Sequence, residues 1–385
     1  MPVSPEEIRA VLERYPRPPL VATVGSHSAL DVADGAATEG FTTLVLAQAG
    51  REATYSRYYR TVRAPDGSRA RGCVDEVWTY PRFADLAAPD AQEKLRARGA
   101  LLVPNRALSS YVPLEVIEDD LRVPIVGSRR LLRIEERTER ENYYSLLEAA
   151  HIPFPRAIPS PAAIDRLAMV KLPHATRRLE RGFFTAASPE EYRAKVERLV
   201  ARGTVAAADL EHARIEEYVL GPVFNFNFFF SPLVPRAEGL ELLGVDERRE
   251  SNLDGLVRLP AAQQLELSET DRIPEYTVVG HGTLTVRESI LEEVFRLGER
   301  FVDASRAAAP PGILGPFCLQ SCIDRDGHLT VFDVAARIGG GTNIHLGVGH
   351  PYGNALWRTP MSTGRRIAVE LRRALEQGRL SEVVT

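Results

Sequence analysis

The sequence predicts an α/β fold that begins with a doubly wound parallel sheet and becomes α+β in its C-terminal part. Apolar runs of strand length occupy residues 20–24 and 42–47, and residues 29–37 between them have helical character. A further helical stretch at 90–98 leads directly into another apolar run at 100–104. Strands that alternate with helices are typical of a parallel sheet with right-handed crossovers. A hairpin pattern near the C-terminus is typical of antiparallel strands instead.

The length and composition restrict the possible classes of protein. A chain of 385 residues is too long for one compact core, which suggests two or three domains. We place a boundary near residues 124–128, and the expected division is 1–127, 128–220 and 221–385. A hydrophobic fraction of 44%, a charged fraction of 26% and a net charge of −4 are typical of a globular protein that does not bind nucleic acid. No apolar run approaches the roughly 20 residues of a membrane span, and the N-terminus lacks signal-peptide character. We therefore expect a cytoplasmic protein with small-molecule partners and no membrane contact, and its three cysteines do not suggest a disulfide framework.

A candidate anion site follows the first strand. The residues Gly25, Ser26, His27 and Ser28 form a tight loop between that strand and the next helix. In open parallel sheets, ligands bind at the carboxyl ends of strands, where helix N-terminal amides can hold an anion. His27 could therefore bind a substrate phosphate, or it could cap the helix without any ligand.

Lys171 is the most informative basic residue. Only three of the 48 basic residues are lysines, and Lys94 and Lys195 lie in charged helical stretches. Residues 131–150 are expected to form one charged helix that ends before a proline-rich segment. Lys171 then ends an apolar run that begins at Leu167, so we expect it at the end of a short strand. An ammonium group in such a place needs an anionic partner, which is either a phosphate or a carboxylate.

Two segments that follow are candidates for nucleotide contacts. Residues 174–182 form a basic loop, which is either a lid over phosphates or a solvated charge run. This loop contains Arg177, Arg178, Arg181 and Gly182. Residues 215–221 are predicted to form a strand that carries Glu216 and Glu217 before a Gly-Pro turn. Backbone groups of such a strand can pair with an adenine edge, while a carboxylate takes the ribose hydroxyls.

Polar residues also mark the strands that come next. Residues 223–230 alternate, with Asn225 and Asn227 on one face and phenylalanines on the other. We expect the phenylalanines in the core, whereas the asparagines either line a cleft or face water. A strand at 240–244 precedes a polar run at 246–255, which is either an active-site loop or an exposed turn.

A late hairpin is predicted to assemble a polar site. Asp326 and Gly327 are the residue types that favour a tight two-residue turn between two apolar runs. With that turn, Gln320 faces Asp333 across the ladder, and their side chains share one face of the sheet. An amide and a carboxylate then point at the same place.

Further groups follow the hairpin in the sequence. Arg337, three glycines and Asn343 could bring a guanidinium, close-approaching backbone and an amide oxygen to the same place. Such a cluster suits a magnesium ion that carries nucleotide phosphates, although an ordinary surface hairpin would have the same pattern. Cys318 and Cys322 lie on the same strand, where we expect buried thiols rather than a metal pair.

Taken in order, these pieces resemble the ATP-grasp superfamily. They are most similar to the family of formate-dependent 5-formaminoimidazole-4-carboxamide ribonucleotide (FAICAR) synthetases of archaeal purine biosynthesis, and the similarity runs over nearly the whole chain. The motifs that carry it are Gly25-Ser26-His27-Ser28, Glu216-Glu217-Tyr218-Val219-Leu220-Gly221, Glu250-Ser251-Asn252-Leu253-Asp254-Gly255, Gly315-Pro316-Phe317-Cys318-Leu319 and Gly339-Gly340-Gly341-Thr342-Asn343.

The resemblance implies an ATP-grasp fold and a carbon–nitrogen ligase that uses ATP with Mg²⁺ or Mn²⁺. Such an enzyme would activate formate as formyl phosphate and transfer the formyl group to the amine of aminoimidazole carboxamide ribonucleotide (AICAR), giving FAICAR, ADP and phosphate. Residues 128–220 would form the nucleotide-binding subdomain with its lid, residues 221–385 would carry the metal site, and the protein would be a homo-oligomer. The implied catalytic residues are Lys171, Arg181 and Arg337. The implied nucleotide-binding residues are Lys171, Arg178, Arg181, Gly182, Glu216, Glu217, Tyr218, Val219 and Glu250. The implied substrate contacts are His27, Ser28, Asn252, His281 and Asn343, and the implied metal ligands are Gln320 and Asp333.

Four features depart from the family pattern. The usual metal pair is two glutamates, whereas Gln320 and Asp333 carry one negative charge fewer. The usual lid is glycine-rich, whereas this one is arginine-rich. Ala107 stands where a serine usually contacts the ribonucleotide, and His281 replaces a usual asparagine. These changes leave two alternatives to the purine reaction, which are a diverged ligase for another amine and carboxylate, and a nucleotide-binding protein without catalysis.

Overall fold

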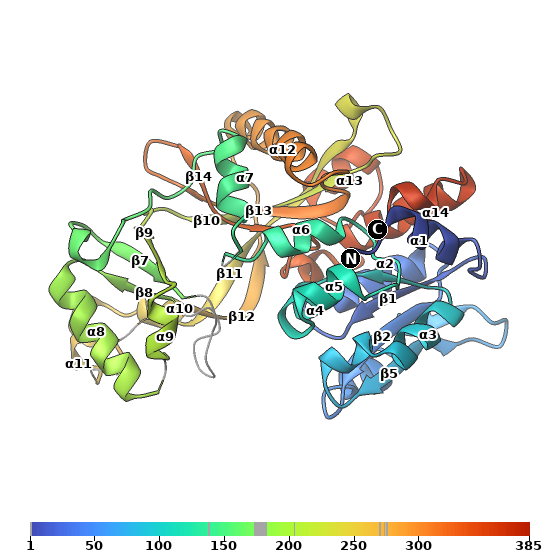
Figure 1. Ribbon diagram of the computed structural model, residues 1–385, viewed down its shortest axis with the longest axis horizontal. Coiled ribbons are helices and arrows are strands. Elements are labelled where there is room, and N and C mark those ends of the chain that lie inside the picture. Colours follow the sequence, from blue (N-terminus) through green and yellow to red (C-terminus); the bar gives the residue numbers. More distant parts are fainter. Residues whose placement is uncertain are drawn as a thin grey trace.

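The computed structural model describes residues 2–137, 139–172, 183–203, 205–268, 271–272, 274 and 276–385. Its first part is built on a four-stranded parallel sheet in the order β5-β2-β1-β6 (Figure 1). The strands are β1 (Leu20–Val24), β2 (Thr43–Gln48), β5 (Glu76–Tyr80) and β6 (Ala100–Val103). The crossover helices include α2 (Ala29–Thr38) and α3 (Pro89–Ala97). The predicted parallel sheet is confirmed, because both neighbours of β1 run parallel to it.

A small antiparallel sheet forms a lobe at one end of the molecule, on the left of Figure 1. Its order is β8-β7-β9, with β7 (Ala168–Lys171) in the centre, β8 (Phe183–Ala186) on one side and β9 (Arg214–Glu217) on the other. Helix α8 (Pro189–Ala201) packs on this sheet through Tyr192. Lys171 ends the central strand, as the sequence predicts.

A five-stranded antiparallel sheet forms the third part, in the order β12-β11-β10-β13-β14. Its strands are β10 (Val223–Phe230), β11 (Leu240–Asn252), β12 (Tyr276–Thr283), β13 (Gly315–Ile323) and β14 (Leu329–Ala335). Phe226, Phe228 and Phe230 of β10 lie in a core shared with α7 (Tyr143–Ala149) and α12 (Glu288–Ala308), whereas Phe229 lies in the core that includes residues of α14 (Thr363–Glu376); the expected burial of the phenylalanines is confirmed. The expected loop or turn at 246–255 is wrong, because most of this run belongs to β11, which pairs with β12 as far as Asn252.

The hairpin between β13 and β14 has a different turn from the predicted one. Ile323 pairs with Leu329, and the intervening loop is organised by Asp324, whose carboxylate accepts the backbone N–H groups of Asp326 and His328, each at 2.9 Å. The expected two-residue turn is therefore wrong. A bulge beside Gln320 shifts the register by one residue, so Gln320 still faces Asp333 as the sequence predicts.

The predicted helix over residues 131–150 is also wrong, because it is broken into α6 (Arg129–Ile134) and α7. Asn142 begins the second helix, and its side chain accepts the backbone N–H of Tyr144 at 3.0 Å. Glu135 ends the first helix and forms a buried ion pair with Arg337, far away in the sequence. The helix is therefore interrupted because Glu135 pairs with a distant residue and Asn142 caps a new helix, although the sequence pattern favours one continuous helix.

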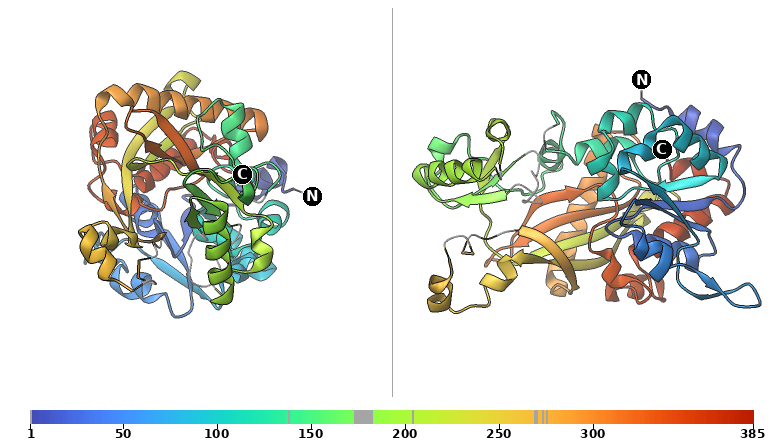
Figure 2. Two further views of the ribbon diagram at one scale, coloured as in Figure 1. Left: turned by 90° about the vertical axis from the view of Figure 1, so that its left-hand side faces the viewer. Right: turned by 90° about the horizontal axis from the view of Figure 1, so that it is seen from below.

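The last long helix returns to the N-terminal sheet (Figure 2). Helix α14 (Thr363–Glu376) crosses α2 where Gly35 meets Gly364, and a side chain on either glycine would overlap the backbone of the other helix. One core joins residues of both helices with the strands around them. The expected division at residues 127 and 220 stays a prediction.

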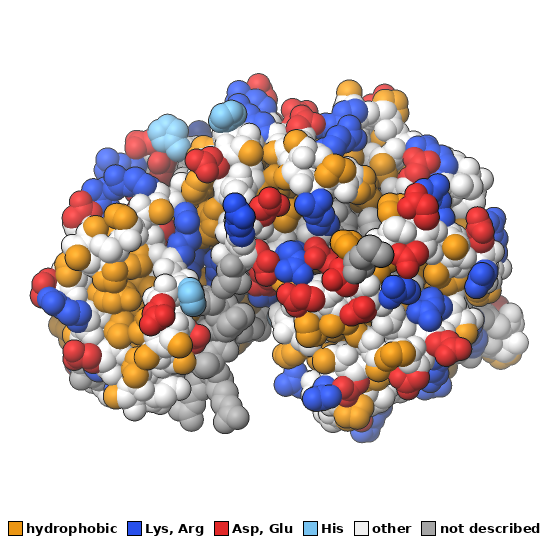
Figure 3. All heavy atoms as spheres, viewed as in Figure 1, with side chains coloured by type: hydrophobic (Ala, Val, Ile, Leu, Met, Phe, Trp, Pro, Cys, Tyr) orange, Lys and Arg blue, Asp and Glu red, His pale blue; other side chains and the backbone are white. Residues whose placement is uncertain are grey.

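The other helices are α1 (Pro5–Leu12), α4 (Arg106–Tyr111), α5 (Leu114–Asp119), α9 (Ala207–Leu210), α10 (Leu253–Leu256), α11 (Ala261–Glu266) and α13 (Pro351–Trp357). A short two-stranded ribbon pairs β3 (Val62–Arg63) with β4 (Arg69–Arg71). Among the described helices, none has the length and apolar character that crossing a bilayer requires. On the face shown in Figure 3, arginine and acidic side chains are interspersed rather than segregated.

A buried histidine pair gives the fold a testable pH dependence. His345 and His350 pack edge to face behind β11, with ring centres 4.9 Å apart. Burial lowers the pKa of His345 to about 3 in the folded protein. Below pH 6.5, this histidine therefore binds a proton in the unfolded chain but not in the folded protein. As the pH decreases from 6.5 to 3, protonation of His345 in the unfolded chain should therefore lower the free energy of unfolding by about 1.4 kcal/mol for each pH unit.

Urea unfolding of the wild type and of His345→Gln between pH 7.5 and 5 measures this contribution. The difference in unfolding free energy between the two proteins should move in favour of the variant as the pH falls. The same pH dependence in both proteins would show that His345 does not contribute to it.

Candidate active site

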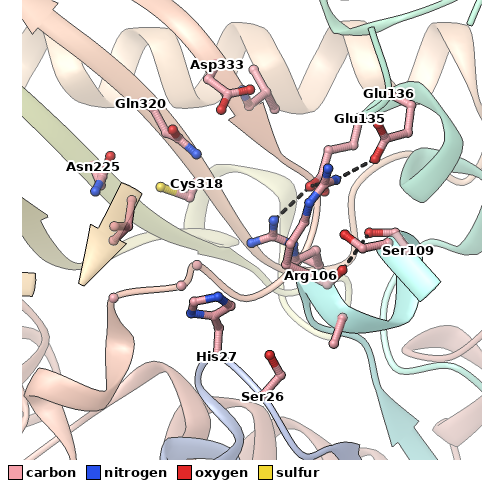
Figure 4. A pocket seen from close by; sticks show the side chains of 18 of the residues that line it. Ser26, His27, Arg106, Ser109, Glu135, Glu136, Asn225, Cys318, Gln320 and Asp333 are labelled. Carbon is pink, nitrogen blue, oxygen red and sulfur yellow. Dashed lines mark hydrogen bonds and ion pairs between the residues drawn. The ribbon is translucent and has the colours of Figure 1, made fainter. Parts of the chain in front are cut away.

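A cavity of about 770 Å³ lies between the parallel sheet and the five-stranded sheet. Its wall includes Ser26, His27, Arg106, Ala107, Ser109, Glu135, Arg137, Asn225, Asp246, Arg248, His281, Cys318, Gln320, Asp333, Arg337 and Gly339 to Gly341. In Figure 4, His27 and Ser26 lie on one side of this space, and Asn225, Gln320 and Asp333 lie on the other. Segments far apart in the sequence therefore share one cavity.

The parallel sheet supplies one wall from the carboxyl ends of its strands. Ser26 and His27 follow β1, whereas Arg106 and Ser109 lie on α4, which follows β6. Asn105 ties the two segments together, because its side-chain amide donates to the backbone oxygens of Val24 at 2.7 Å and His27 at 3.1 Å. The predicted placement of His27 at a strand end is confirmed.

The five-stranded sheet supplies the opposite wall through a row of polar side chains. Asp246 on β11 faces Asn225 on β10, which faces Gln320 on β13, which in turn faces Asp333 on β14. Directly opposed residues of neighbouring strands project to the same face. We call these four residues the polar row, and it places amide and carboxylate groups along one line of the cavity.

Buried charge surrounds one end of the cavity. The Arg337 guanidinium donates to Glu135 at 2.8 Å, and the other carboxylate oxygen of Glu135 accepts the Ala336 N–H at 3.2 Å. Arg106 lies 3.4 Å from Glu135 and also pairs with Glu136. Burial raises the pKa of Glu135, an effect that Arg337 opposes. Glu135 therefore fixes the position of an arginine that the sequence singles out.

The glycine run after Arg337 passes close to the polar wall. A side chain on Gly339 would overlap the amide oxygen of Asn227, and one on Gly341 would overlap the carboxylate of Asp246. The Cβ of His27 would lie 3.9 Å from a Cβ on Gly340. The predicted close approach of this backbone is confirmed, because only glycine leaves room between the two walls.

Arg248 links two of the implied ligand positions. Its guanidinium donates to the side-chain oxygen of Gln320, and it stands opposite His281 in the pairing of β11 with β12. Asp333 accepts the Val334 N–H at 3.1 Å. Gln320, Asp333, His281 and Arg337 therefore share one cavity with His27, as expected for a common site.

Lys171 lies in a separate buried cluster. Its ammonium group pairs with Glu216, and it also donates to the backbone oxygen of Phe332 at 2.9 Å and the Tyr144 hydroxyl at 3.1 Å. The side chains of Lys171 and Glu216 are only 4% and 2% exposed. A phosphate and a carboxylate were the two partners expected for Lys171, and the structure shows a carboxylate, that of Glu216. From the sequence, a carboxylate of this strand was expected to bind the ribose hydroxyls instead.

Other implied residues lie outside the wall of the cavity. Glu217 accepts the Arg156 N–H at 3.1 Å, and the backbone of Tyr218 and Val219 continues from β9, with the Val219 oxygen near the Cys322 thiol at 3.6 Å. Glu250 and Asn252 lie on the distal half of β11, where the Asn252 amide donates to the Asp271 oxygen at 3.1 Å.

Two further implied residues hold the glycine run against α2. Ser28 donates its hydroxyl to the Gly339 oxygen, and the amide oxygen of Asn343 accepts the Asp31 N–H at 3.0 Å. The lid residues Arg178, Arg181 and Gly182 lie outside the described residues. Their implied contacts stay predictions.

Several wall residues were not singled out from the sequence. Arg106 follows a predicted parallel strand. Its position at the carboxyl end of that strand could have identified it as a candidate ligand-binding residue. Asp246 and Arg248 are alternate residues, which is the period of a strand, but their run was interpreted as a loop or turn. Glu135 carries no local signal, because its partner Arg337 is distant in the sequence.

Comparison with known proteins extends these observations. Two family models match the chain, one described as "Protein of unknown function (DUF1246)" over residues 21–158 and one as "Domain of unknown function (DUF1297)" over residues 191–385. A 5-formaminoimidazole-4-carboxamide-1-(beta)-D-ribofuranosyl 5'-monophosphate synthetase of Methanopyrus kandleri is 40% identical over 384 residues, which covers 100% of both chains. The synthetase of the same name from Methanothermobacter thermautotrophicus is 38% identical over 100% of this chain and 99% of its own.

Solved structures agree with these relatives. The IMP biosynthesis protein PurP from Thermococcus kodakaraensis superposes with a TM-score of 0.69 at 31% identity, over 95% of this chain and all of that one. The N5-carboxyaminoimidazole synthetase of Staphylococcus aureus, solved with ADP, has a TM-score of 0.54 at 10% identity over 84% of this chain and 72% of its own, so it shares the fold. The chain therefore belongs to the family of 5-formaminoimidazole-4-carboxamide ribonucleotide synthetases, and it is a carbon–nitrogen ligase with an ATP-grasp fold.

Proposed function

We propose that this ligase uses ATP to activate formate as formyl phosphate and transfers the formyl group to the 5-amino group of AICAR. The products are FAICAR, ADP and phosphate. The names of these relatives support the product, and the match covers 99% and 100% of their lengths. The observation that carries the proposal is a single cavity that joins the His27 loop to the polar row and four arginines.

The two walls suit the two kinds of substrate. The wall formed by His27, Ser26, Ser109 and Arg106 carries hydroxyl, imidazole and guanidinium groups, which suit a ribose phosphate. The wall formed by Gln320, Asp333 and Arg337 suits the phosphates of ATP. With both substrates in one cavity, a reactive acyl phosphate meets the amine without release to water.

Charge neutralisation carries the phosphoryl step. The attacking formate oxygen and the phosphates of ATP are all negative, so their approach needs fixed positive groups. Arg248 and Arg337 line the cavity, and the buried Glu135 carboxylate orients Arg337. After transfer, the amine attacks the formyl carbon, the bond from that carbon to the phosphate oxygen breaks, and the nitrogen loses one proton.

Gln320 and Asp333 fit one Mg²⁺ or Mn²⁺ ion. Their oxygen donors come from neighbouring strands and share one face of the sheet, and such hard donors suit these ions. Arg248 donates to the side-chain oxygen of Gln320, so an ion held there would compete with this contact. Such an ion would neutralise part of the phosphate charge.

We place the adenine at the connection after β9, where Glu217, Tyr218 and Val219 leave the small lobe. The basic segment over residues 174–182 covers the phosphates in this proposal. Lys171 lies at the end of β7, next to Glu216, so binding of a phosphate to its ammonium group exchanges one anionic partner for another.

A diverged ligase for another amine is the second candidate. The observation in its favour is Ala107, which lines the cavity without a hydroxyl where the family pattern has a serine. Ser109 and Ser110 on the same helix also line the cavity, so a hydroxyl is still available nearby. His281 lines it as well, and an imidazole there retains hydrogen-bonding capacity.

ADP release with Mg-ATP, formate and AICAR, with each component omitted in turn, tests the proposed reaction. We expect turnover only with all three, and a product heavier than AICAR by one formyl group in place of hydrogen. Turnover with a different amine or carboxylate and none with this pair would favour the diverged ligase.

Lys171→Ala is expected to abolish turnover and to destabilise the protein by about 3 kcal/mol, because the buried carboxylate of Glu216 loses its ammonium partner and keeps only Arg214 and the Tyr144 hydroxyl. The double variant Lys171→Met/Glu216→Gln removes both charges, so urea unfolding should show most of the stability restored. Turnover should stay absent in this double variant. If activity returns with stability, Lys171 has only a structural role.

Asp333→Asn should raise the Mg²⁺ concentration for half-maximal turnover by on the order of tenfold, because the only anionic donor of the implied pair is lost. Asp326→Asn is the matched control, since this acid lies on the exposed turn of the same hairpin. Equal Mg²⁺ dependence in the two variants would remove the hairpin from the metal site.

A further inference from the structure

Asp246 organises a buried hydrogen-bond cluster at one end of the polar row. Its carboxylate accepts the side-chain amide of Asn225 at 2.8 Å and that of Asn227 at 2.6 Å, one on each oxygen. Asp246 is fully buried, and Asn225 is only 4% exposed. Burial raises the pKa of Asp246 to about 6, so it is a carboxylate at neutral pH.

The charge of Asp246 determines how both amides are turned. A carboxylate only accepts hydrogen bonds, so the NH₂ group of each asparagine has to face it. The carbonyl oxygen of Asn225 is then directed away from Asp246, and it has no hydrogen-bond partner among the described residues. A buried acceptor without a donor is unfavourable, so this oxygen is a natural site for a ligand N–H.

The two asparagines differ in what covers their oxygens. Asn227 packs against Gly339, where even one added carbon would overlap its oxygen, and it is not part of the cavity wall that the structure describes. Asn225 contributes to the wall and stands directly opposite Gln320. Of the two amides, Asn225 is therefore the one placed to meet a ligand.

The chemistry selects among the substrates. Formate and the ATP phosphates carry only acceptor oxygens toward the cavity, and a carbonyl oxygen backed by a carboxylate repels them. An amine or a carboxamide NH₂ offers the donor that this oxygen lacks. The neighbouring Gln320 lies at the implied phosphate and metal end of the row, so a nitrogen bound to Asn225 lies beside the activated acyl group.

We propose that the Asn225 side-chain oxygen, held in place by Asp246, accepts an N–H from the imidazole substituents of the amine substrate and thereby determines specificity for that substrate. This inference rests on the proposed function. Asp246 is a positioning residue that acts through Asn225, and neither residue was assigned a role by the sequence pattern of the family.

The variant Asp246→Asn tests this arrangement. An amide at position 246 can donate as well as accept, so it no longer forces the NH₂ group of Asn225 to face it. We expect the KM for AICAR to rise by about tenfold or more, whereas the KM values for ATP and formate stay within about twofold. Inhibition by ribose 5-phosphate, which shares the ribose phosphate but has no N–H, should be unchanged.

Two further variants make the outcome decisive. Asp303→Asn makes the same substitution at an exposed ion pair with Arg236, away from the cavity, and should leave every constant unchanged. Asn225→Ala removes the acceptor but leaves Asp246 paired with Asn227, and it should reproduce the selective rise in the KM for AICAR. Thermal unfolding of each variant shows whether it is folded.

Calorimetric titration with AICAR measures the same contact without turnover, so it separates this inference from the proposed reaction. Weaker binding of AICAR by both cavity variants, with unchanged ribose 5-phosphate binding, is the expected result. Unchanged AICAR binding in folded Asp246→Asn and Asn225→Ala would overturn the inference, as would no AICAR binding by the wild type. A wild type that binds AICAR but shows no turnover with formate and ATP would overturn the proposed reaction alone.

Discussion

The pairing register of the five-stranded sheet is the constraint on which the rest of the site depends. Side chains of a strand alternate between its two faces, so one register sends the phenylalanines of β10 into the core and turns Asn225 toward the cavity. The same register aligns Asp246, Asn225, Gln320 and Asp333 across four strands. A slip by one residue would turn these polar or charged side chains toward the apolar core, which strongly disfavours the alternatives.

The second wall is held against this sheet by groups that tolerate little change. Glu135 reaches from the end of α6 to Arg337, and the glycine run passes the polar wall so closely that Gly339 and Gly341 leave no space for a side chain. Further away, Gly35 and Gly364 let α2 and α14 touch through their backbones. Close contacts between backbone segments and buried ion pairs therefore shape the cavity. They hold the parallel sheet of the N-terminal part against the polar face of the five-stranded sheet.

Local patterns in the sequence predict much of the fold, because strand length and alternation are local properties. Residues 20–24 form a strand as expected, and Gln320 faces Asp333 although the turn that joins their strands is longer than predicted. The register survived because a bulge beside Gln320 compensates for the longer loop. Where the prediction was wrong, the deciding contact is distant: Glu135 ends a helix to meet Arg337, and β12 extends the polar run of β11 into a strand. The same reason explains why only part of the candidate site was predicted. His27 follows a strand and Asp333 lies in a hairpin, which are local patterns, whereas no local pattern marks Glu135.

In the proposed reaction, the cavity activates a carboxylate by phosphoryl transfer before the amine attacks it. Formate labelled with ¹⁸O in both oxygens distinguishes this route, because one oxygen of formyl phosphate must bridge carbon and phosphorus. Each turnover should place one ¹⁸O in inorganic phosphate and leave the other in the formamide of the product, and mass spectrometry can detect both. Phosphate without ¹⁸O, alongside a labelled formamide, would contradict activation through an acyl phosphate.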